Sequence, residues 1–282
     1  MIDETIARIR EMRTHSESTV AVDATLALEE LLDREYVGIE EFERDLERNA
    51  GALRRSNLSH ALLHTAMQET IRDVVGKADT VAEAKQLLRE TIDREVDTIE
   101  RSKHEAAANA AERLEDGETI LTHENSTTVM ETLRRGIDSG KEFTVYVTET
   151  RPRYIGRLTV RELATWDGVD PHLVTDSAAG HFAREADRVL LGMNCIVEET
   201  YYNRIGTFPL CAVASVLDRP VTVVAASRKI VDEGFAFEND QRSPSEVLAE
   251  PAEGFTVENP AYDATPLELV DTVVTESGFL AV

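Results

Sequence analysis

The stretch that decides the fold runs from residue 119 to residue 147 and reads TILTHENSTTVMETLRRGIDSGKEFTVYV. Apolar runs at Thr119–Thr122 and Phe143–Val147 predict buried strands, and Thr127–Ile137 between them has the spacing of a helix. Two buried strands separated by a helix of this length predict a β-α-β unit in a parallel sheet.

The same alternation continues downstream. Further strands are predicted at His172–Thr175, Arg188–Leu191 and Val221–Ala225, and further helices at Val160–Trp166, Ala178–Ala186 and Pro209–Leu217. We therefore expect residues 116–282 to form an α/β domain with a doubly wound parallel sheet.

Residues 1–115 carry a helical pattern throughout. Apolar residues recur at steps of three and four in Ile2–Met12, and further helices are predicted over about Ile39–Leu53 and Leu58–Val75. Thr80 and Glu83 form a capping box that opens a last helix, expected to reach Leu114. The sequence thus predicts an all-helical N-terminal domain over residues 1–115.

The charge of the chain limits its partners. The 282 residues include 54 Asp and Glu against 30 Lys and Arg, a formal net charge of −24. This argues against a direct nucleic-acid binder, because phosphate contacts need clustered basic side chains, and it disfavours an anionic membrane surface. Lysine is rare among the basic residues, and an acidic, lysine-poor surface suits solubility in a halophilic cytoplasm.

Neither a cofactor nor a metal is expected. No G-x-G-x-x-G follows a strand, and Gly136–Lys141 has the wrong spacing for a phosphate loop, so we interpret it as a turn. His60 and His64 are four residues apart on a helix, but no third ligand is evident, which favours a packed or capping pair. Cys195 and Cys211 cannot make a disulfide framework, and no apolar run is long enough to span a membrane.

Polar residues gather where the predicted strands end. His123 and Glu124 follow the first strand, Arg151 the second, Asp176 the third and Asn194 the fourth. Ligands of such sheets lie beyond the carboxyl ends of the strands, so we expect these residues to surround a ligand. Arg151 suits bidentate capture of a phosphate or carboxylate, with an internal salt bridge as the equal alternative.

Several ordered motifs point to one family. They are Ile120–His123, Val145–Pro152, Val174–Asp176, Val189–Gly192, Asn203–Thr207, Asn259–Pro266 and Thr275–Gly278. This order resembles the family that unites the regulatory (alpha, beta, delta) subunits of translation initiation factor 2B with methylthioribose-1-phosphate isomerase and ribose-1,5-bisphosphate isomerase. The resemblance implies a helical N-terminal domain, a Rossmann-like domain and assembly as a homodimer or larger ring.

The departures from the isomerase pattern bear on activity. Glu124 stands where the isomerases carry a general-acid cysteine, and Asn194 stands where they carry a partner aspartate, with Cys195 in place of the usual arginine. His15–Ser18, which includes Glu17, is the best match to a phosphate-binding Arg-Gly-Ala segment. Asn203-Arg204 replaces an Asn-Lys pair.

These departures favour a protein without catalysis. Asn194 cannot accept a proton, and the loss of one acid–base partner costs roughly 10²–10⁴ in rate. We therefore expect a relative of the regulatory subunits, an archaeal protein acting in translation initiation or its control through a factor-2-type partner. The degenerate positions Glu124 and Asn194 would leave it without catalytic residues.

Two alternatives remain. One is an aldose–ketose isomerase that uses Glu124 as a new acid and base, with Arg151 and Arg204 as anchors. The other is a sensor that binds a sugar phosphate or nucleotide without converting it. The expected ligand-binding set is His123, Glu124, Arg151, Asp176, Asn194, Asn203 and Arg204.

Overall fold

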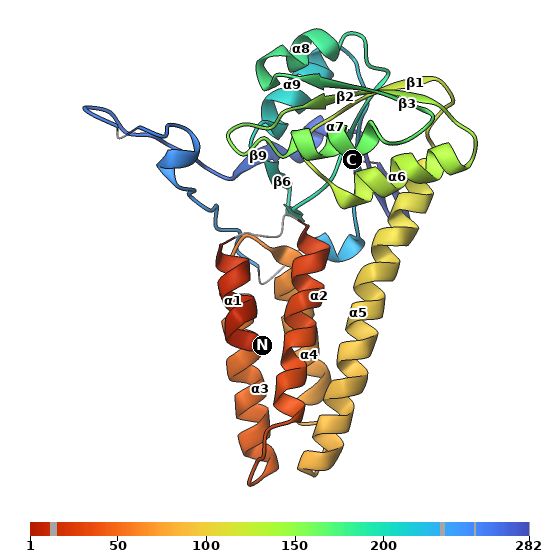
Figure 1. Cartoon of the computed structure of the whole chain (residues 1–282). Helices are drawn as coiled ribbons and strands as arrows, with labels where there is room; N and C mark the ends of the chain where they lie inside the picture. The colour runs from red at the N-terminus through yellow and green to blue at the C-terminus, as the bar shows by residue number, and fades with distance from the viewer. Residues whose placement is uncertain (12–15, 232–234, 251, 282) are drawn as a thin grey trace. The chain divides into compact units, whose positions relative to one another are not determined.

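A computed structural model describes residues 1–11, 16–231, 235–250 and 252–281 (Figure 1). They divide into two compact units: residues 1–101 with 233–238, and residues 102–232 with 239–282, each as far as it is described. Helix α5 (Val81–Ala111) contributes to both units. The expected domain boundary between residues 115 and 116 stays a prediction.

The first unit is helical, as predicted. It contains α1 (Ile2–Arg10), α2 (Glu17–Ala27), the 3-10 helix η1 (Leu28–Leu32), α3 (Ile39–Arg54), α4 (Ala61–Val74) and the first part of α5. Its core is built from fully buried aliphatic side chains such as Leu28, Leu46, Leu62 and Leu88. Burial of the apolar face of each helix in this core stabilises helices that are too short to be stable alone. Met12, placed on the first helix by its spacing, lies outside the described residues.

The ends of α5 are fixed by side chains. The capping box is confirmed, because Glu83 N–H donates to Thr80 Oγ1 (3.3 Å) and Thr80 N–H donates to Glu83 Oε2 (3.1 Å). The predicted end at Leu114 is wrong, since the helix ends at Ala111. Lys141 Nζ donates to the carbonyls of Ala111 (2.9 Å) and Leu114 (2.7 Å), which satisfies acceptors that the helix leaves open.

The second unit is built on a seven-stranded sheet in the order β11-β10-β7-β4-β1-β2-β3. The strands are β1 (Glu118–Thr122), β2 (Phe143–Thr148), β3 (Val169–Val174), β4 (Arg188–Leu191), β7 (Val221–Val224), β10 (Thr272–Thr275) and β11 (Gly278–Ala281). All neighbouring pairs are parallel except β10 with β11. The predicted parallel sheet is therefore confirmed.

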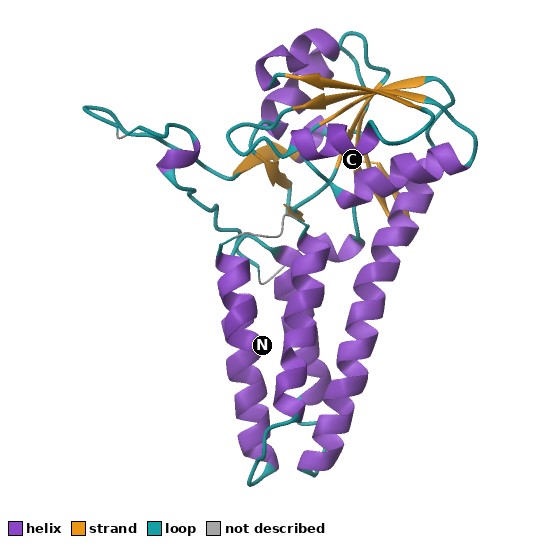
Figure 2. Cartoon of the chain, in the orientation of Figure 1, coloured by secondary structure: helices purple, strands orange, loops and turns teal. Residues whose placement is uncertain are grey.

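Helices cover both faces of this sheet (Figure 2). They are α6 (Thr127–Asp138), α7 (Gly156–Leu163), α8 (Ala179–Phe182) and α9 (Thr207–Val216). Ile120 and Leu190 belong to the core shared with α6 and α7, whereas their neighbours Leu121 and Leu191 belong to the core shared with α8 and α9. Alternate residues of each central strand thus face opposite layers, which explains why these strands read as continuous apolar runs.

Some predicted elements of this unit need correction. The predicted helix Ala178–Ala186 is only Ala179–Phe182, because Asp187 N–H must reach Thr119 O (2.8 Å) to bring the chain back into the sheet. Strand β3 begins at Val169, earlier than expected, and contains Pro171. Proline is tolerated there because β3 is an edge strand.

A second, four-stranded sheet was missed by sequence reasoning. Its order is β8-β5-β6-β9, with β5 at Cys195–Val197, β6 at Thr200–Arg204, β8 at Ile230–Val231 and β9 at Tyr262–Pro266. These strands are short and mix polar with apolar residues, so no apolar run marks them. Cys195 opens the strand β5 of this sheet.

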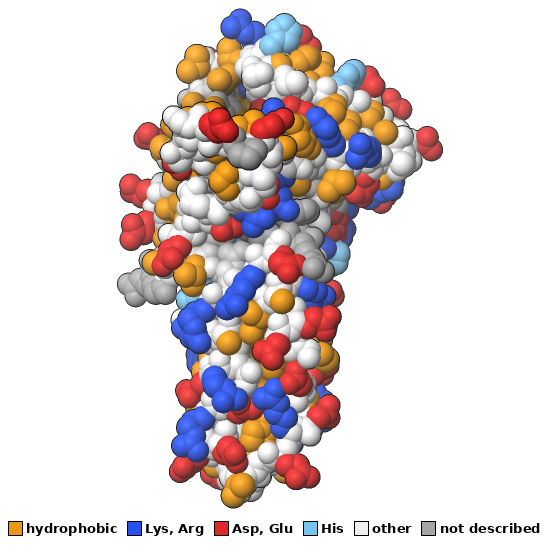
Figure 3. All heavy atoms as spheres, turned by 60° about the vertical axis from the view of Figure 1, so that its left-hand side comes forward, with side chains coloured by type: hydrophobic (Ala, Val, Ile, Leu, Met, Phe, Trp, Pro, Cys, Tyr) orange, Lys and Arg blue, Asp and Glu red, His pale blue; other side chains and the backbone are white. Residues whose placement is uncertain are grey.

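The surface is acidic and mixed. In the view of Figure 3, acidic side chains are spread over both units with Lys and Arg between them. Among the described residues, no helix is both long and apolar enough to cross a membrane. Adaptation to high salt and a cytoplasmic location stay predictions.

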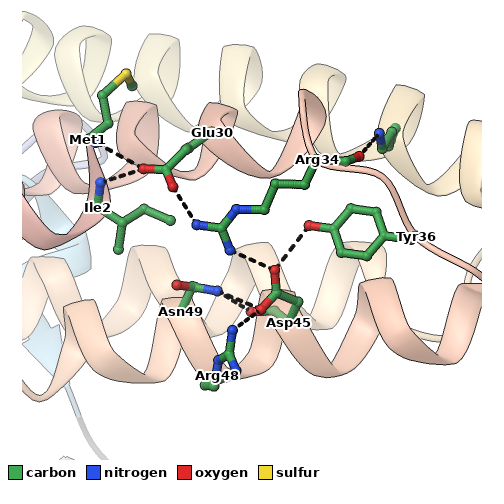
Figure 4. A network of polar contacts seen from close by, with 9 residues as sticks. Met1, Ile2, Glu30, Arg34, Tyr36, Asp45, Arg48 and Asn49 are labelled. Atoms are coloured by element: carbon green, nitrogen blue, oxygen red, sulfur yellow. Dashed lines mark hydrogen bonds and ion pairs between the residues drawn. The ribbon is translucent and has the colours of Figure 1, made fainter.

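A network of charged side chains ties the helices of the first unit together (Figure 4). Glu30 accepts hydrogen bonds from Ile2 N–H (2.9 Å) and the guanidinium of Arg34, and it pairs with the amino group of Met1 (2.9 Å). Arg34 Nη1 also donates to Asp45 Oδ2 (2.8 Å). The hydrogen bonds from Ile2, the amino group and Arg34 lower the pKa of Glu30 from 4.5 to about 2.

This network predicts a pH-dependent effect of Glu30→Gln. The pKa of Glu30 is lower in the folded state, so its contribution is present above pH 4.5 and is lost as the pH falls toward 2. Because the site is partly exposed, we expect the variant to unfold about 2–4 °C below wild type at pH 7. Circular dichroism melts from pH 7 to pH 3 measure this difference, which should shrink below pH 4.5.

The exposed neighbour Glu29 provides the matched control, Glu29→Gln, which should melt like wild type at every pH. A difference for Glu30→Gln that stays constant down to pH 3 would contradict the ionic origin of this stabilisation.

Candidate functional site

The candidate site lies at the carboxyl edge of the seven-stranded sheet, where β1 and β4 are neighbours. The strand order reverses here: β2 and β3 lie on one side of β1, and β4 and β7 on the other. Loops that leave such a reversal diverge to opposite faces and make room for a ligand between them. His123 and Glu124 leave β1 at this point, and Asn194 follows β4 after two residues.

His123 is held inside the protein by both ring nitrogens. Nε2 lies 2.9 Å from the carbonyl oxygen of Ile205, and Nδ1 lies 2.5 Å from Thr148 Oγ1. A carbonyl only accepts, so Nε2 carries the proton in the neutral ring. Gly206 packs on the ring with φ of +106°, and a Cβ there would lie 2.7 Å from the His123 ring. His123 thus fixes the loop after β6, and a ligand contact for it stays a prediction.

Glu124 is the buried carboxylate of the site. Its φ is +66°, in the left-handed region that a side chain of this size rarely adopts. Its N–H donates to Thr150 Oγ1 (2.9 Å), and its carbonyl accepts from Thr159 Oγ1 (2.7 Å). A backbone held in this region costs about 1–3 kcal/mol, and it is found where the surrounding structure fixes a functional group.

The carboxylate of Glu124 faces Arg204. Arg204 Nε lies 3.4 Å from Glu124 Oε2, and both side chains are about 10% exposed. The Arg204 guanidinium also lies over the Tyr262 ring, 4.7 Å from its centroid. Gly192, the residue after β4, lies close to the Glu124 carboxylate: a Cβ added to Gly192 would be 3.5 Å from Glu124 Oε1. The structure therefore brings Glu124 and Arg204 together from different sheets.

Asn194 is buried between β4 and β5. Its N–H donates to the carbonyl of Tyr202 (3.2 Å), and Nδ2 lies 3.8 Å from Cys195 Sγ. The preceding residue is held by Lys229, whose Nζ donates to the Met193 carbonyl (2.6 Å). An amide side chain can donate and accept hydrogen bonds but cannot take up a proton at physiological pH.

Arg151 and Asp176 have different environments. The Asp176 carboxylate accepts from the N–H groups of Thr150 (2.8 Å) and Arg151 (2.7 Å), so it shapes the loop after β2. The Arg151 side chain is exposed, and among the described residues it makes no ion pair. The alternative of an internal salt bridge for Arg151 finds no support there, and ligand binding by either residue stays a prediction.

Asn203, Cys211 and the His60–His64 pair make contacts within the protein. Asn203 is buried, with Nδ2 3.2 Å from Thr207 Oγ1, and its role in ligand binding stays a prediction. Cys211 is buried, and burial raises the pKa of its thiol to about 12. His60 precedes α4 and His64 packs on Phe235, with ring centroids 5.2 Å apart.

No group of three metal-binding side chains occurs in the described ranges. Of the expected anion segment His15–Ser18, His15 lies outside them. Glu17 is buried in the first unit.

Sequence reasoning missed several residues that hold the site. Thr150 and Thr159 fix the backbone of Glu124, and Tyr262 supports Arg204. Thr150 lay in the motif that carried the resemblance, so its hydroxyl could have been considered. Tyr262 also lay in one of these motifs, Asn259–Pro266, but its place beside Arg204 follows only from the pairing of β9 with β6.

Comparisons with known proteins agree with this fold. A sequence model of the Initiation factor 2 subunit family matches residues 13–282. Ribose 1,5-bisphosphate isomerase from Methanocaldococcus jannaschii is 30% identical and covers 99% of this chain and 91% of its own. Its namesake from Haloterrigena turkmenica is 32% identical over 84% and 76% of the two chains. A putative methylthioribose-1-phosphate isomerase from Archaeoglobus fulgidus is 30% identical over 88% and 78%.

Solved structures show the same architecture. The delta subunit of eIF-2B from A. fulgidus superposes with a TM-score of 0.77 at 26% identity, covering 99% of this chain and 87% of that one. The eIF-2B structure from Pyrococcus horikoshii gives a TM-score of 0.85 at 23% identity over 99% and 96%, which shows the shared fold. The resemblance seen in the motifs is thereby confirmed, and the chain belongs to the Initiation factor 2 subunit family.

Proposed function

We propose that this protein is an aldose–ketose isomerase that acts on a phosphorylated pentose of the ribose-1,5-bisphosphate type. The observation that carries the proposal is the buried carboxylate of Glu124, held at the end of β1 beside Arg204. Glu124 moves the proton, and Arg204 stabilises negative charge that develops on a substrate oxygen.

The proton balance of the reaction permits a single carboxylate. An aldose and its ketose have the same composition, so the enzyme takes up no net proton. The reaction breaks the bond between C1 and the ring oxygen, moves a hydride from C2 to C1 and turns the 2-hydroxyl into a carbonyl. Glu124 can take the proton that the 2-hydroxyl releases and deliver a proton to the ring oxygen, so its own protonation is unchanged over the cycle. Asn194 would contribute hydrogen bonds to sugar hydroxyls, for which its amide has both donors and an acceptor.

Similarity to named isomerases supports this function over the non-catalytic role favoured by the sequence motifs. Relatives named ribose 1,5-bisphosphate isomerase match nearly the whole chain at about 30% identity. A shared fold alone would not decide the question, because it also includes regulatory subunits. The carboxylate at position 124 supplies the chemical group that catalysis needs.

A second candidate is a non-catalytic relative of the factor 2B regulatory subunits. It is favoured by Asn194, which removes one of the two proton-transfer groups expected at this edge. In that role the protein would bind a factor-2-type partner, and the site would sense a sugar phosphate or nucleotide. Turnover of the pentose distinguishes the two candidates.

The remaining expectations concern the setting of the protein. We propose a homodimer or larger assembly in a halophilic archaeal cytoplasm. The acidic, lysine-poor composition supports the high-salt setting. The exposed apolar residues of α9, Phe208 and Val216, are consistent with assembly.

The proposal predicts that Glu124→Gln abolishes most of the activity. The amide keeps the size of the side chain but cannot transfer a proton, so kcat should fall by roughly 10²–10⁴. The measurement is conversion of ribose-1,5-bisphosphate by the full chain in high salt. Glu162→Gln removes an exposed carboxylate on α7 and should leave kcat unchanged. Equal activity of the Glu124→Gln protein and wild type would refute the assigned role.

Arg204 gives a second prediction. Arg204→Gln removes the charge beside Glu124, and kcat should fall by about 10–100-fold because developing negative charge loses its counter-charge. Arg204→Lys keeps the charge and should recover part of that loss. Steady-state kinetics give kcat and KM for each variant, and circular dichroism checks folding. A folded Arg204→Gln protein with wild-type kcat would contradict this role.

A further inference from the structure

Outside the Glu124–Arg204 pair, two arginines of the second unit share one carboxylate. Arg153 follows β2 in the loop that also carries Arg151, and Arg242 lies in the segment that precedes β9. Both reach the same carboxylate oxygen: Glu246 Oε1 is 3.1 Å from Arg242 Nη2 and 3.9 Å from Arg153 Nε. Two guanidinium groups from distant parts of the sequence thus converge on one anion.

Backbone hydrogen bonds to residues 259–261 hold the chain around Arg242 in place. Arg242 N–H donates to the Asn259 carbonyl (2.8 Å), and Ala261 N–H donates to the Asp240 carbonyl (2.9 Å). Gln241 and Pro260 also form an isolated β-bridge, so residues 240–242 pair with residues 259–261. The backbone of Arg242 is therefore fixed, while Glu246 lies further along, in the short 3-10 helix η4 (Pro244–Glu246).

The arginines retain unused hydrogen-bonding capacity. Within the described residues, Arg153 makes no hydrogen bond, and the buried Nε of Arg242 has no acceptor. The side chains are 26% and 17% exposed. Burial, and then the neighbouring charges of Arg242 and Arg204, lower the pKa of Arg153 below its ordinary value.

Carboxylates only partly balance this charge. Asp240 Oδ2 lies 3.2 Å from Arg242 Nη1, but Asp240 is the more exposed member of that pair. The Glu246 carboxylate also has another partner, because its Oε2 accepts a hydrogen bond from Asn259 Nδ2 (3.3 Å). A phosphate group brings more charge and more acceptor oxygens than this carboxylate, in a geometry that guanidinium groups bind well.

We propose that Arg153 and Arg242 form a phosphate subsite, and that Glu246 occupies it as a tethered counter-ion until a phosphate group replaces it. Arg204 pairs with Glu124, and its charge also acts on Arg153, so we assign the phosphate to the sugar that Glu124 acts on. That last assignment rests on the proposed function, whereas the binding of a phosphate does not.

The test is titration calorimetry of the full chain with inorganic phosphate in a constant salt background. Glu246→Gln removes the competing charge and should tighten phosphate binding by about tenfold. Arg153→Gln should weaken it by about tenfold, because one charged donor is lost. Glu250→Gln, an exposed change in the same segment, is the matched control and should bind like wild type.

The outcomes separate this subsite from the proposed function. Unchanged phosphate affinity in both Glu246→Gln and Arg153→Gln, with folding verified by thermal melts, would overturn the subsite even if the pentose is converted. Weaker binding in Glu246→Gln would also overturn it, since Glu246 would then support the ligand instead of competing with it. The predicted affinity changes without any turnover would support the subsite and reject the isomerase.

Discussion

The ion pair between Glu124 and Arg204 is the interaction on which the account of the site depends. It joins the end of β1 in the large sheet to the end of β6 in the small sheet, at 3.4 Å and with both side chains about 10% exposed. A buried charge is retained only when a partner offsets its desolvation. The pair therefore explains why a glutamate can occupy the first loop of the sheet, while Thr150 and Thr159 hold its backbone in the left-handed region.

The large sheet could be predicted from the sequence because its central strands are buried on both faces. Strands such as Phe143–Thr148 read as apolar runs, and the helices between them have clear periodicity. The small sheet could not be predicted in this way. Strand β6, Thr200–Arg204, is short and carries Asn203 and Arg204, so its pattern is that of a loop. Its place depends on pairing with β9, some sixty residues later in the chain.

The sequence likewise gives the candidate residues of the site but not the contacts between them. The sequence motifs identified Glu124, Asn194 and Arg204 as candidates, but only the fold shows that Glu124 and Arg204 are in contact. His123 and Asp176 were identified for their position at strand ends, and the structure shows them bonding mainly to the protein itself. Arg153 and Glu246 have no sequence pattern that joins them, because their contact arises from a segment that returns to the sheet edge.

In the proposed function, a single buried carboxylate allows this scaffold to rearrange a phosphorylated pentose. The most direct measurement is a phosphorus NMR time course of the wild-type chain mixed with an equal amount of ribose-1,5-bisphosphate in high salt. The account predicts that the two substrate resonances decline while those of the ketose bisphosphate grow. Substrate resonances that broaden on binding but never give way to product would contradict it.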